Sequence, residues 1–292
     1  MIIRTIDFFD LKQIADSGQC FRMAPLIGQE GDGFRIISRG RLLDVFQQKR
    51  TFSFHCSEED MPYWEEYFDL KTDYGKIAAS AALEDTYLQK AALFGSGIRI
   101  LRQEPWEMII TFIISQQKTI PKIKESVELL SRTYGKKLSC AGHTFYAFPS
   151  PEELSSASLD ELLSLKLGYR AKYIYHICQD AISGRLDLHS LSSMDYFQAM
   201  DYLTGFYGIG RKVADCICLF GLHHINAFPI DTWIQKILLR EYYQPLYEAI
   251  PKKHLYQKIV RDHFSCYEGF AGVMQQYIFY YERYSSSHHS LL

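Results

Sequence analysis

A lysine follows two closely spaced glycines in the second half of this 292-residue chain. Lys212 comes directly after Gly208, Gly210 and an arginine, and Asp231 stands nineteen residues further on, after Pro-Ile. A neutral primary amine can act as a nucleophile, and a fixed carboxylate can stabilise a positive charge that develops during the reaction. Lys212 and Asp231 are therefore the candidate catalytic residues.

The residues around this lysine predict two helices joined by a tight turn. One helix ends near Leu203, GFYGIG forms the turn, and the next helix runs from Arg211 to about Phe220, where Gly221 can end it. The turn glycines allow positive φ or close backbone approach, and the amides that open the second helix can bind a phosphate. Gly208 and Gly210 are thus candidate DNA-binding positions, although a plain glycine-stopped connector is an alternative for so short a motif.

Lys212 lies at the edge of the apolar face of the second helix, because Cys216 and Leu219 follow it at spacings of four and seven. Lost hydration there, with Arg211 alongside, favours the neutral amine. The alternative is a lysine that extends to solvent. Asp231 opens the segment TWIQKILLR and can also cap a helix. The roles of helix cap and of catalytic carboxylate are compatible in Asp231.

The composition is that of an ordinary folded protein, with 47% hydrophobic and 23% charged residues and a net charge of -2. Any surface for nucleic acid must therefore be a local patch. The 7 cysteines are scattered without a C-x-x-C pair, which argues against disulfides and against a metal or iron–sulfur site. Neither a signal peptide nor a membrane span is recognised, so we expect a soluble intracellular protein of a prokaryotic cytoplasm.

The elements that must position these residues change character along the chain. GFRIISRGRLLDVFQQ and TFSFHC alternate as strands do, whereas helical spacing dominates from SEEDMPYWEEYFDL onward. This order indicates an α+β fold, an antiparallel β-sheet followed by a mostly α-helical region with a helix-hairpin-helix. We expect an N-terminal sheet domain with helices over residues 1–103, a helical domain over 104–285 and a frayed tail over 286–292.

Several segments resemble one family of repair enzymes. LTGFYGIGRKVADC followed by AFPID resembles the helix-hairpin-helix and Gly/Pro-Asp signature of base-excision DNA glycosylases, and a lysine at position 212 resembles their bifunctional subgroup. GRKVADCICL, FPID, SGQCFRM and LGYRAKYI are similar to 8-oxoguanine DNA glycosylases in particular, in that family's order from Ser17 to Asp231. No four-cysteine cluster follows Asp231, which separates the chain from the iron–sulfur glycosylases.

The resemblance implies excision of 8-oxoguanine from double-stranded DNA, with no metal or cofactor. The damaged nucleotide is flipped out of the duplex, Lys212 attacks the anomeric carbon, and Asp231 stabilises the developing positive charge. The resulting Schiff base permits β-elimination. The Gly18 carbonyl would accept the N7–H that guanine lacks, and Cys216 would pack on the base. A turn glycine and a core thiol are the alternatives for these two residues.

The resemblance also implies DNA contacts around the lesion. In SQQKTIPKIK, the candidates for filling the gap left by the flipped base are Gln117, Lys118 and Thr119, where the eukaryotic enzymes have asparagines. Tyr169 matches a wedge aromatic, Arg170 matches a reader of the opposite cytosine, and Lys122 replaces a second reading arginine. A weakened preference for cytosine is the resulting hypothesis. A solvated helix face is the alternative for these residues.

The last helix departs most from the family. Alignment of YEGFAGVMQQYIF puts Gly272 in place of a base-reading glutamine and Gln276 in place of a stacking aromatic, and Trp233 stands where a histidine is common. A small change of register would bring Gln275, Gln276 or Tyr277 into the pocket, so the sequence leaves these residues unassigned.

Two other functions stay open at this point. One is a glycosylase for another damaged purine, and the other is a non-catalytic helix-hairpin-helix module that only binds DNA. We expect a monomer, because one flipped base occupies one pocket.

Overall fold

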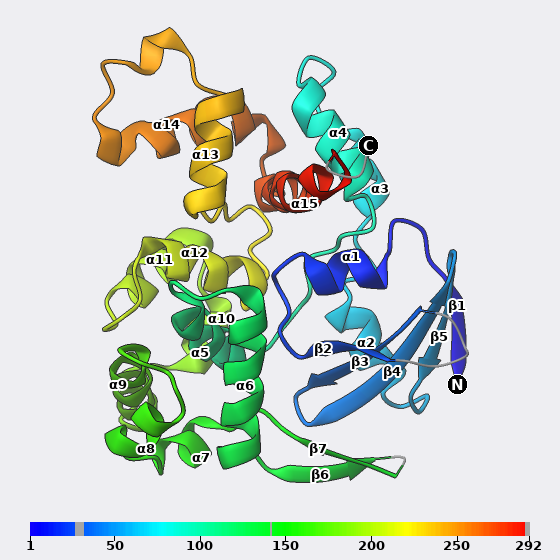
Figure 1. Ribbon diagram of the computed structural model, residues 1–292, viewed down its shortest axis with the longest axis vertical. Coiled ribbons are helices and arrows are strands. Elements are labelled where there is room, and N and C mark those ends of the chain that lie inside the picture. Colours follow the sequence, from blue (N-terminus) through cyan, green and yellow to red (C-terminus); the bar gives the residue numbers. More distant parts are fainter. Residues whose placement is uncertain (27–31, 141, 290–292) are drawn as a thin grey trace.

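The computed structural model describes residues 1–26, 32–140 and 142–289. A five-stranded antiparallel sheet lies beside a larger body of helices, which confirms the predicted α+β class (Figure 1). Within the described ranges, no helix combines the length and the hydropathy needed to cross a membrane.

The sheet has the strand order β1-β5-β4-β3-β2. Its strands are β1 (Ile2–Thr5), β2 (Met23–Leu26), β3 (Asp32–Ser38), β4 (Arg41–Gln48) and β5 (Thr51–His55). The sequence predicted β3, β4 and β5 but neither β1 nor β2, because a run of four residues carries little alternation. Arg39 and Gly40, with φ of 47° and 71°, form the tight turn between β3 and β4.

Two helices, α1 (Leu11–Asp16) and α2 (Met61–Tyr67), pack with the sheet around the smaller of two hydrophobic cores. Leu43 and Val45 of β4 enter this core, and Trp64 of α2 is completely buried in it. Alternate residues of β4 reach the core because successive strand side chains point to opposite faces.

The helical body contains the remaining elements. They are α3 (Tyr74–Ala79), α4 (Thr86–Phe94), α5 (Pro105–Ser115), α6 (Ile120–Tyr134), α7 (Pro151–Ser155), α8 (Leu159–Ser164), α9 (Arg170–Ile182), α10 (Leu188–Ser193), α11 (Tyr196–Thr204), α12 (Arg211–Phe220), α13 (Thr232–Glu241), α14 (Lys252–Phe264) and α15 (Ala271–His289). Two 3₁₀ turns, Pro245–Tyr247 and Ser265–Tyr267, and a hairpin of β6 (Lys137–Cys140) and β7 (His143–Tyr146) complete the fold. The predicted helices α5, α6, α9 and α15 are confirmed; the β6–β7 hairpin was not predicted.

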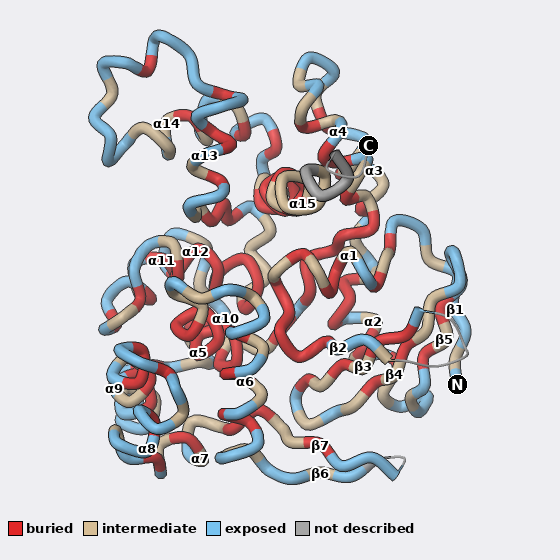
Figure 2. Tube along the Cα trace, viewed as in Figure 1, coloured by how far each residue is buried: buried red, intermediate tan, exposed pale blue. Residues whose placement is uncertain are grey.

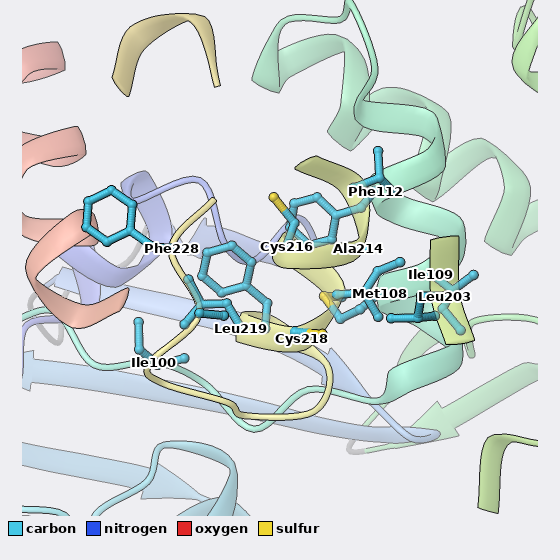
Figure 3. Close-up of a cluster of buried hydrophobic side chains, with 14 of the residues drawn as sticks. Ile100, Met108, Ile109, Phe112, Leu203, Ala214, Cys216, Cys218, Leu219 and Phe228 are labelled. Atoms are coloured by element: carbon cyan, nitrogen blue, oxygen red, sulfur yellow. The ribbon is translucent and has the colours of Figure 1, made fainter. Parts of the chain in front are cut away.

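Helix α5 lies at the centre of the larger core. All its residues from Trp106 to Ile114 are buried (Figure 2). The ring of Phe112 stacks on that of Phe220 in α12, with ring centres 5.4 Å apart. Figure 3 shows Phe112 in the same buried cluster as Cys216 of α12. Because α12 is anchored at its apolar side, its first turn is held in a fixed position.

The two predicted domains share the larger core. Helices α3 and α4 precede residue 103, yet their buried residues belong to the helical core. The ring centres of Phe94 and Tyr280 are 5.4 Å apart, and those of Tyr87 and Tyr281 are 5.6 Å apart, so α4 packs along α15. Helix α15 continues to His289, and residues 290–292 lie outside the described part, so the frayed tail expected over 286–292 stays a prediction.

Candidate active site

The predicted helix-hairpin-helix is formed by α11 and α12. Gly208 has a φ of +90°, and a Cβ there would lie 2.3 Å from Cγ of Tyr173 in α9, so this position requires glycine for two reasons. Gly210 has a φ of -88° and is the N-cap of α12 without a side-chain cap. A Cβ at Gly210 would meet nothing within 4 Å. The amides that open α12 therefore have no capping side chain in front of them.

These amides border a cavity of about 970 Å³. Its walls come from the loop before α6 and from the first turns of α6, α12 and α13, together with α15. The lining residues are Gly18, Phe21, Phe112, Ser115, Gln116, Gln117, Lys118, Thr119, Ile120, Pro121, Ile123, Gly210, Arg211, Lys212, Val213, Ile230, Asp231, Thr232, Trp233, Gln235, Phe279 and Arg283. Both candidate catalytic residues thus face one space.

Lys212 reaches the cavity from the first turn of α12. Its Nζ lies 5.7 Å from the centre of the Phe112 ring and within hydrogen-bonding reach of the Cys216 thiol. Burial raises the pKa of that thiol to about 11, although Lys212 acts in the opposite direction. Cys216 is therefore a neutral thiol, and the role of Lys212 as the nucleophile stays a prediction.

Asp231 lines the same cavity as the N-cap of α13. Its Oδ1 accepts a hydrogen bond of 2.8 Å from the backbone N–H of Ile234, which confirms the predicted cap. The bond fixes the carboxylate, while its second oxygen has no hydrogen-bond partner among the described residues. Its role in catalysis stays a prediction.

A smaller inner hollow opens behind the lysine. It is lined by Ser17, Gly18, Phe112, Lys212, Cys216, Phe220, Pro229, Asp231, Gln275, Gln276 and Phe279. Gly18 has a φ of +80°, and a Cβ there would lie 3.3 Å from side-chain carbons of both Ile120 and Phe279. The next residue, Gln19, is buried and bonds Arg99 O and Leu101 N, each at 2.8 Å. The Gly18 segment is therefore anchored to the chain that links sheet and helices.

The structure corrects the alignment of the last helix. Gly272 lies against the backbone, since a Cβ there would be 2.2 Å from the carbonyl oxygen of Ala227. Gln275 and Phe279, one helical turn apart, line the inner hollow, and Gln276 joins them. The sequence missed Gln275 and Phe279 as a pair, although a glutamine and an aromatic at a spacing of four were the available signal.

The predicted gap-filling residues form the loop between α5 and α6. Gln117 has a φ of +52° and is exposed, as is Thr119, and both border the cavity with Lys118. The Lys118 Nζ donates to Ser126 Oγ at 2.7 Å. Partial burial, and then the nearby Arg170 guanidinium, lower the pKa of this amine.

The other predicted DNA contacts differ in exposure. The Tyr169 ring is exposed, and Lys122 pairs with Glu125 at 2.7 Å on the surface of α6. Arg170 is buried, and its Nε and Nη2 donate to the carbonyl oxygen of Gln116, the first at 2.8 Å. Arg170 does not border the large cavity, and its reading of a cytosine stays a prediction.

Charge is unevenly distributed around the cavity. Among its described lining residues, Lys118, Arg211, Lys212 and Arg283 are cationic, and Asp231 alone is anionic. This is the local positive patch that a chain with a net charge of -2 needs in order to bind a polyanion. Within the described ranges, no group of three or more His, Cys, Asp or Glu residues could hold a metal ion.

The sheet, the hairpin and the cavity define a helix-hairpin-helix protein of the base-excision repair class. Residues 110–258 match the family model of the HhH-GPD superfamily base excision DNA repair protein. Residues 1–109 match that of the 8-oxoguanine DNA glycosylase N-terminal domain. The chain belongs to the 8-oxoguanine DNA glycosylase family of this superfamily.

Individual relatives agree with this assignment. The chain is 35% identical over 164 residues to the N-glycosylase/DNA lyase of Saccharomyces cerevisiae, covering 52% of this chain and 44% of the relative. It is 32% identical over 191 residues to a probable N-glycosylase/DNA lyase of Methanothermobacter thermautotrophicus, and this match covers 59% of this chain and 60% of the relative. The chain thus spans about half the length of these curated relatives.

Solved structures match over almost the whole chain. The 8-oxoguanine glycosylase/lyase of Clostridium acetobutylicum, in complex with double-stranded DNA containing cytosine opposite 8-oxoguanine, has a TM-score of 0.88 and 35% identity. The match covers 97% of this chain and 95% of that one. A 3-methyladenine DNA glycosylase from Archaeoglobus fulgidus, at 20% identity and a TM-score of 0.72, shares the fold.

Proposed function

We propose that the protein excises 8-oxoguanine from duplex DNA and then cuts the strand at the resulting abasic site. The observation that carries the proposal is that Lys212 and Asp231 line the same cavity, beside the uncapped amides of the hairpin. The family relationship supports the same reaction.

The reaction begins when the damaged nucleotide leaves the duplex and enters the cavity. The Lys212 amine attacks the anomeric carbon, the glycosidic bond breaks, and its electron pair leaves with the base, which takes up a proton. Asp231 stabilises the positive charge on the sugar. Loss of a proton from nitrogen and opening of the sugar ring give a Schiff base, whose electron-withdrawing character allows β-elimination of the 3′ phosphate.

The flipped oxidised purine would lie where the large cavity meets the inner hollow, because Gly18, Lys212 and Phe279 border both. The Gly18 carbonyl accepts the N7–H of 8-oxoguanine, which is the group that guanine lacks. Cys216 and Phe279 border the same hollow and supply apolar surfaces for the faces of the base. Gln275, buried beside them, reads the Watson–Crick edge.

The protein acts as a monomer, and the residues at the rim of the cavity bind the surrounding DNA. Its cations neutralise phosphates, Gln117 enters the space left by the flipped base, and Tyr169 stacks beside it. Arg170 and Lys122 are already bonded within the protein. These bonds support a weakened preference for cytosine opposite the lesion, because neither side chain is free to read that base without losing a partner.

Borohydride trapping tests the proposal. An 8-oxoguanine:cytosine duplex is incubated with wild type, with Lys212→Gln and with Lys118→Gln, which removes another amine of the same cavity. We expect a covalent adduct with wild type and Lys118→Gln but none with Lys212→Gln, and none with an undamaged duplex. Equal trapping of Lys212→Gln would overturn the assignment of the nucleophile.

The same experiment separates the alternatives. Trapping with a duplex that contains another damaged purine, but not with 8-oxoguanine, would indicate a glycosylase for that lesion. Binding without any trapping, equally tight for damaged and intact duplex, would indicate a non-catalytic DNA-binding module.

A further inference from the structure

Two adjacent glutamines of α15 lie inside the hollow that would receive the base. Gln275 is 3% exposed and Gln276 is 4% exposed, and both line the hollow with Gly18 and Phe279. Buried amides normally have all their polar atoms hydrogen-bonded. The bonds that this pair makes, and those it lacks, define what it can recognise.

The two amides are joined by one hydrogen bond. Nε2 of Gln276 donates to Oε1 of Gln275 at 2.9 Å. Oε1 of Gln276 is buried and has no partner, and Nε2 of Gln275 donates to none of the described residues. The pair therefore offers a donor group that is wholly unused, the NH₂ of Gln275, and an acceptor atom that is wholly unused, Oε1 of Gln276.

This pattern matches the Watson–Crick edge of a guanine-type base when Gln275 faces position 6 of the base and Gln276 faces N1. Such a base presents the acceptor O6 next to the donors N1–H and N2–H₂, whereas an adenine-type base presents the donor N6–H₂ next to the acceptor N1. If the bond between the glutamines were reversed, with Gln275 as donor, the pair would present the adenine pattern. The direction of one side-chain bond thus corresponds to the choice of base.

We propose that Gln276 is a specificity-determining residue that orients the Gln275 amide and itself accepts a hydrogen bond from the base, so that the pair selects oxidised guanine over oxidised adenine. The inference rests on the proposed function, since it assumes that a flipped base enters this hollow. It adds to that function a residue that the sequence comparison placed at a stacking position.

The physical cost of a wrong base supports a strong preference. An oxidised adenine would keep the N7–H contact to Gly18, so its 8-oxo group would not exclude it. It would, however, place N6–H₂ against the Gln275 donor and N1 against the Gln276 acceptor. A buried donor that faces a donor, or an acceptor that faces an acceptor, makes no hydrogen bond. Such sites discriminate between bases by tenfold or more.

The test compares 8-oxoguanine with 8-oxoadenine, each opposite cytosine in the same duplex, by single-turnover release of the base. We expect wild type to release 8-oxoguanine at least about tenfold faster. The comparison is conservative, because the mispaired 8-oxoadenine leaves the duplex more easily. Equal release of the two bases by wild type would overturn the inference, whatever the variants do.

Gln276→Met keeps the side-chain length and removes both hydrogen-bonding groups. We expect it to reduce the ratio of 8-oxoguanine to 8-oxoadenine release by about tenfold. Gln257→Met, on the exposed face of α14, is the matched control and should keep the wild-type ratio. Gln276→Ala is measured alongside, so that a packing defect of the thioether does not decide the result.

Borohydride trapping on a duplex with a preformed abasic site separates this inference from the proposed function. Such DNA contains no base to read, so Gln276→Met should be trapped as well as wild type. Normal trapping with an unchanged base ratio in both Gln276 variants would overturn the inference and leave the lysine chemistry intact. Failure of wild type to release either base or to be trapped would overturn the proposed function itself.

Discussion

At the scale of single residues, Asp231 has an observed structural role and a proposed chemical role in one carboxylate. One oxygen caps α13 through the N–H of Ile234, and the side chain also forms part of the cavity wall. A capping bond already holds the carboxylate in place, so the side chain needs no reorganisation when positive charge develops nearby. In the proposed reaction, the cap therefore preorganises the carboxylate that stabilises the developing charge.

Replacement of Asp231 by asparagine separates the two roles. Asparagine caps a helix almost as well as aspartate, so the free energy of unfolding should fall by less than about 1 kcal/mol. Loss of the negative charge should slow single-turnover excision by about 10²-fold or more. Urea denaturation and base release provide the two measurements.

Asp187→Asn is the matched control, because Asp187 caps α10 and does not line the cavity. It should leave excision at the wild-type rate. Normal excision by Asp231→Asn, with normal stability, would show that Asp231 is only a cap.

Sequence reasoning found the residues of this site that sit in sharply defined local patterns. Lys212 follows a glycine turn, Asp231 precedes a helix, and Gly18 and Cys216 belong to recognisable segments; the structure brings all four to one hollow. Sequence reasoning could not set the register of α15, because this helix is rich in apolar and aromatic residues on several faces. That register depends on the contact of Gly272 with Ala227, a tertiary contact that no local pattern contains.

At the scale of elements, three segments that we propose to face DNA are linked by hydrogen bonds. Arg170, at the start of α9, donates to the carbonyl of Gln116, and Nε2 of Gln116 donates to the carbonyl of Gly208 at 3.0 Å. The loop before α6, the first turn of α9 and the hairpin are thus connected. Local sequence identified each segment, but the link depends on residues 54 and 92 positions apart in the chain.

The two hairpin glycines should respond differently to alanine. At Gly210 a Cβ meets no atom within 4 Å and φ is ordinary, so Gly210→Ala should change the free energy of unfolding by no more than about 0.5 kcal/mol. Its methyl group would nevertheless lie beside the amides that bind phosphate, so affinity for duplex DNA should fall. Thermal unfolding and fluorescence anisotropy with labelled duplex measure the two effects.

Gly208→Ala should instead lower stability by more than about 1 kcal/mol, because its Cβ would overlap the Tyr173 ring in addition to the strain of a positive φ. Unchanged DNA affinity of Gly210→Ala would argue against phosphate binding at the start of α12.

At the scale of the whole molecule, the change from alternating to helical periodicity predicted the α+β class and the order of its parts. It did not predict that α3 and α4 pack with α15, because the ring contacts that join them span nearly two hundred residues. The larger core is therefore completed by helices that precede residue 103 in the chain. Glu107 of α5 is also buried.

Burial raises the pKa of Glu107 to about 7, with Arg22 acting in the opposite direction. The folded protein therefore holds this proton more tightly than the unfolded chain, and stability should decrease as the pH rises from about 4.5 to 7. Glu107→Gln removes the ionisation. The difference in the free energy of unfolding between Glu107→Gln and wild type should shift in favour of the variant by about 2 to 3 kcal/mol from pH 5 to pH 8.

Urea denaturation of both proteins at the two pH values measures this difference. Glu58→Gln, at an exposed position, should show little change. A difference between Glu107→Gln and wild type that is the same at both pH values would contradict the predicted cost of ionising Glu107.

The contact between Gly208 and Tyr173 also restricts how this sequence can drift. The tyrosine ring occupies the space in which any side chain at position 208 would begin. A larger residue at 208 becomes tolerable only after the ring has gone, and loss of the ring first would remove the support of the hairpin. Substitutions at these two positions are therefore expected to be inherited together, in descendants that have acquired both.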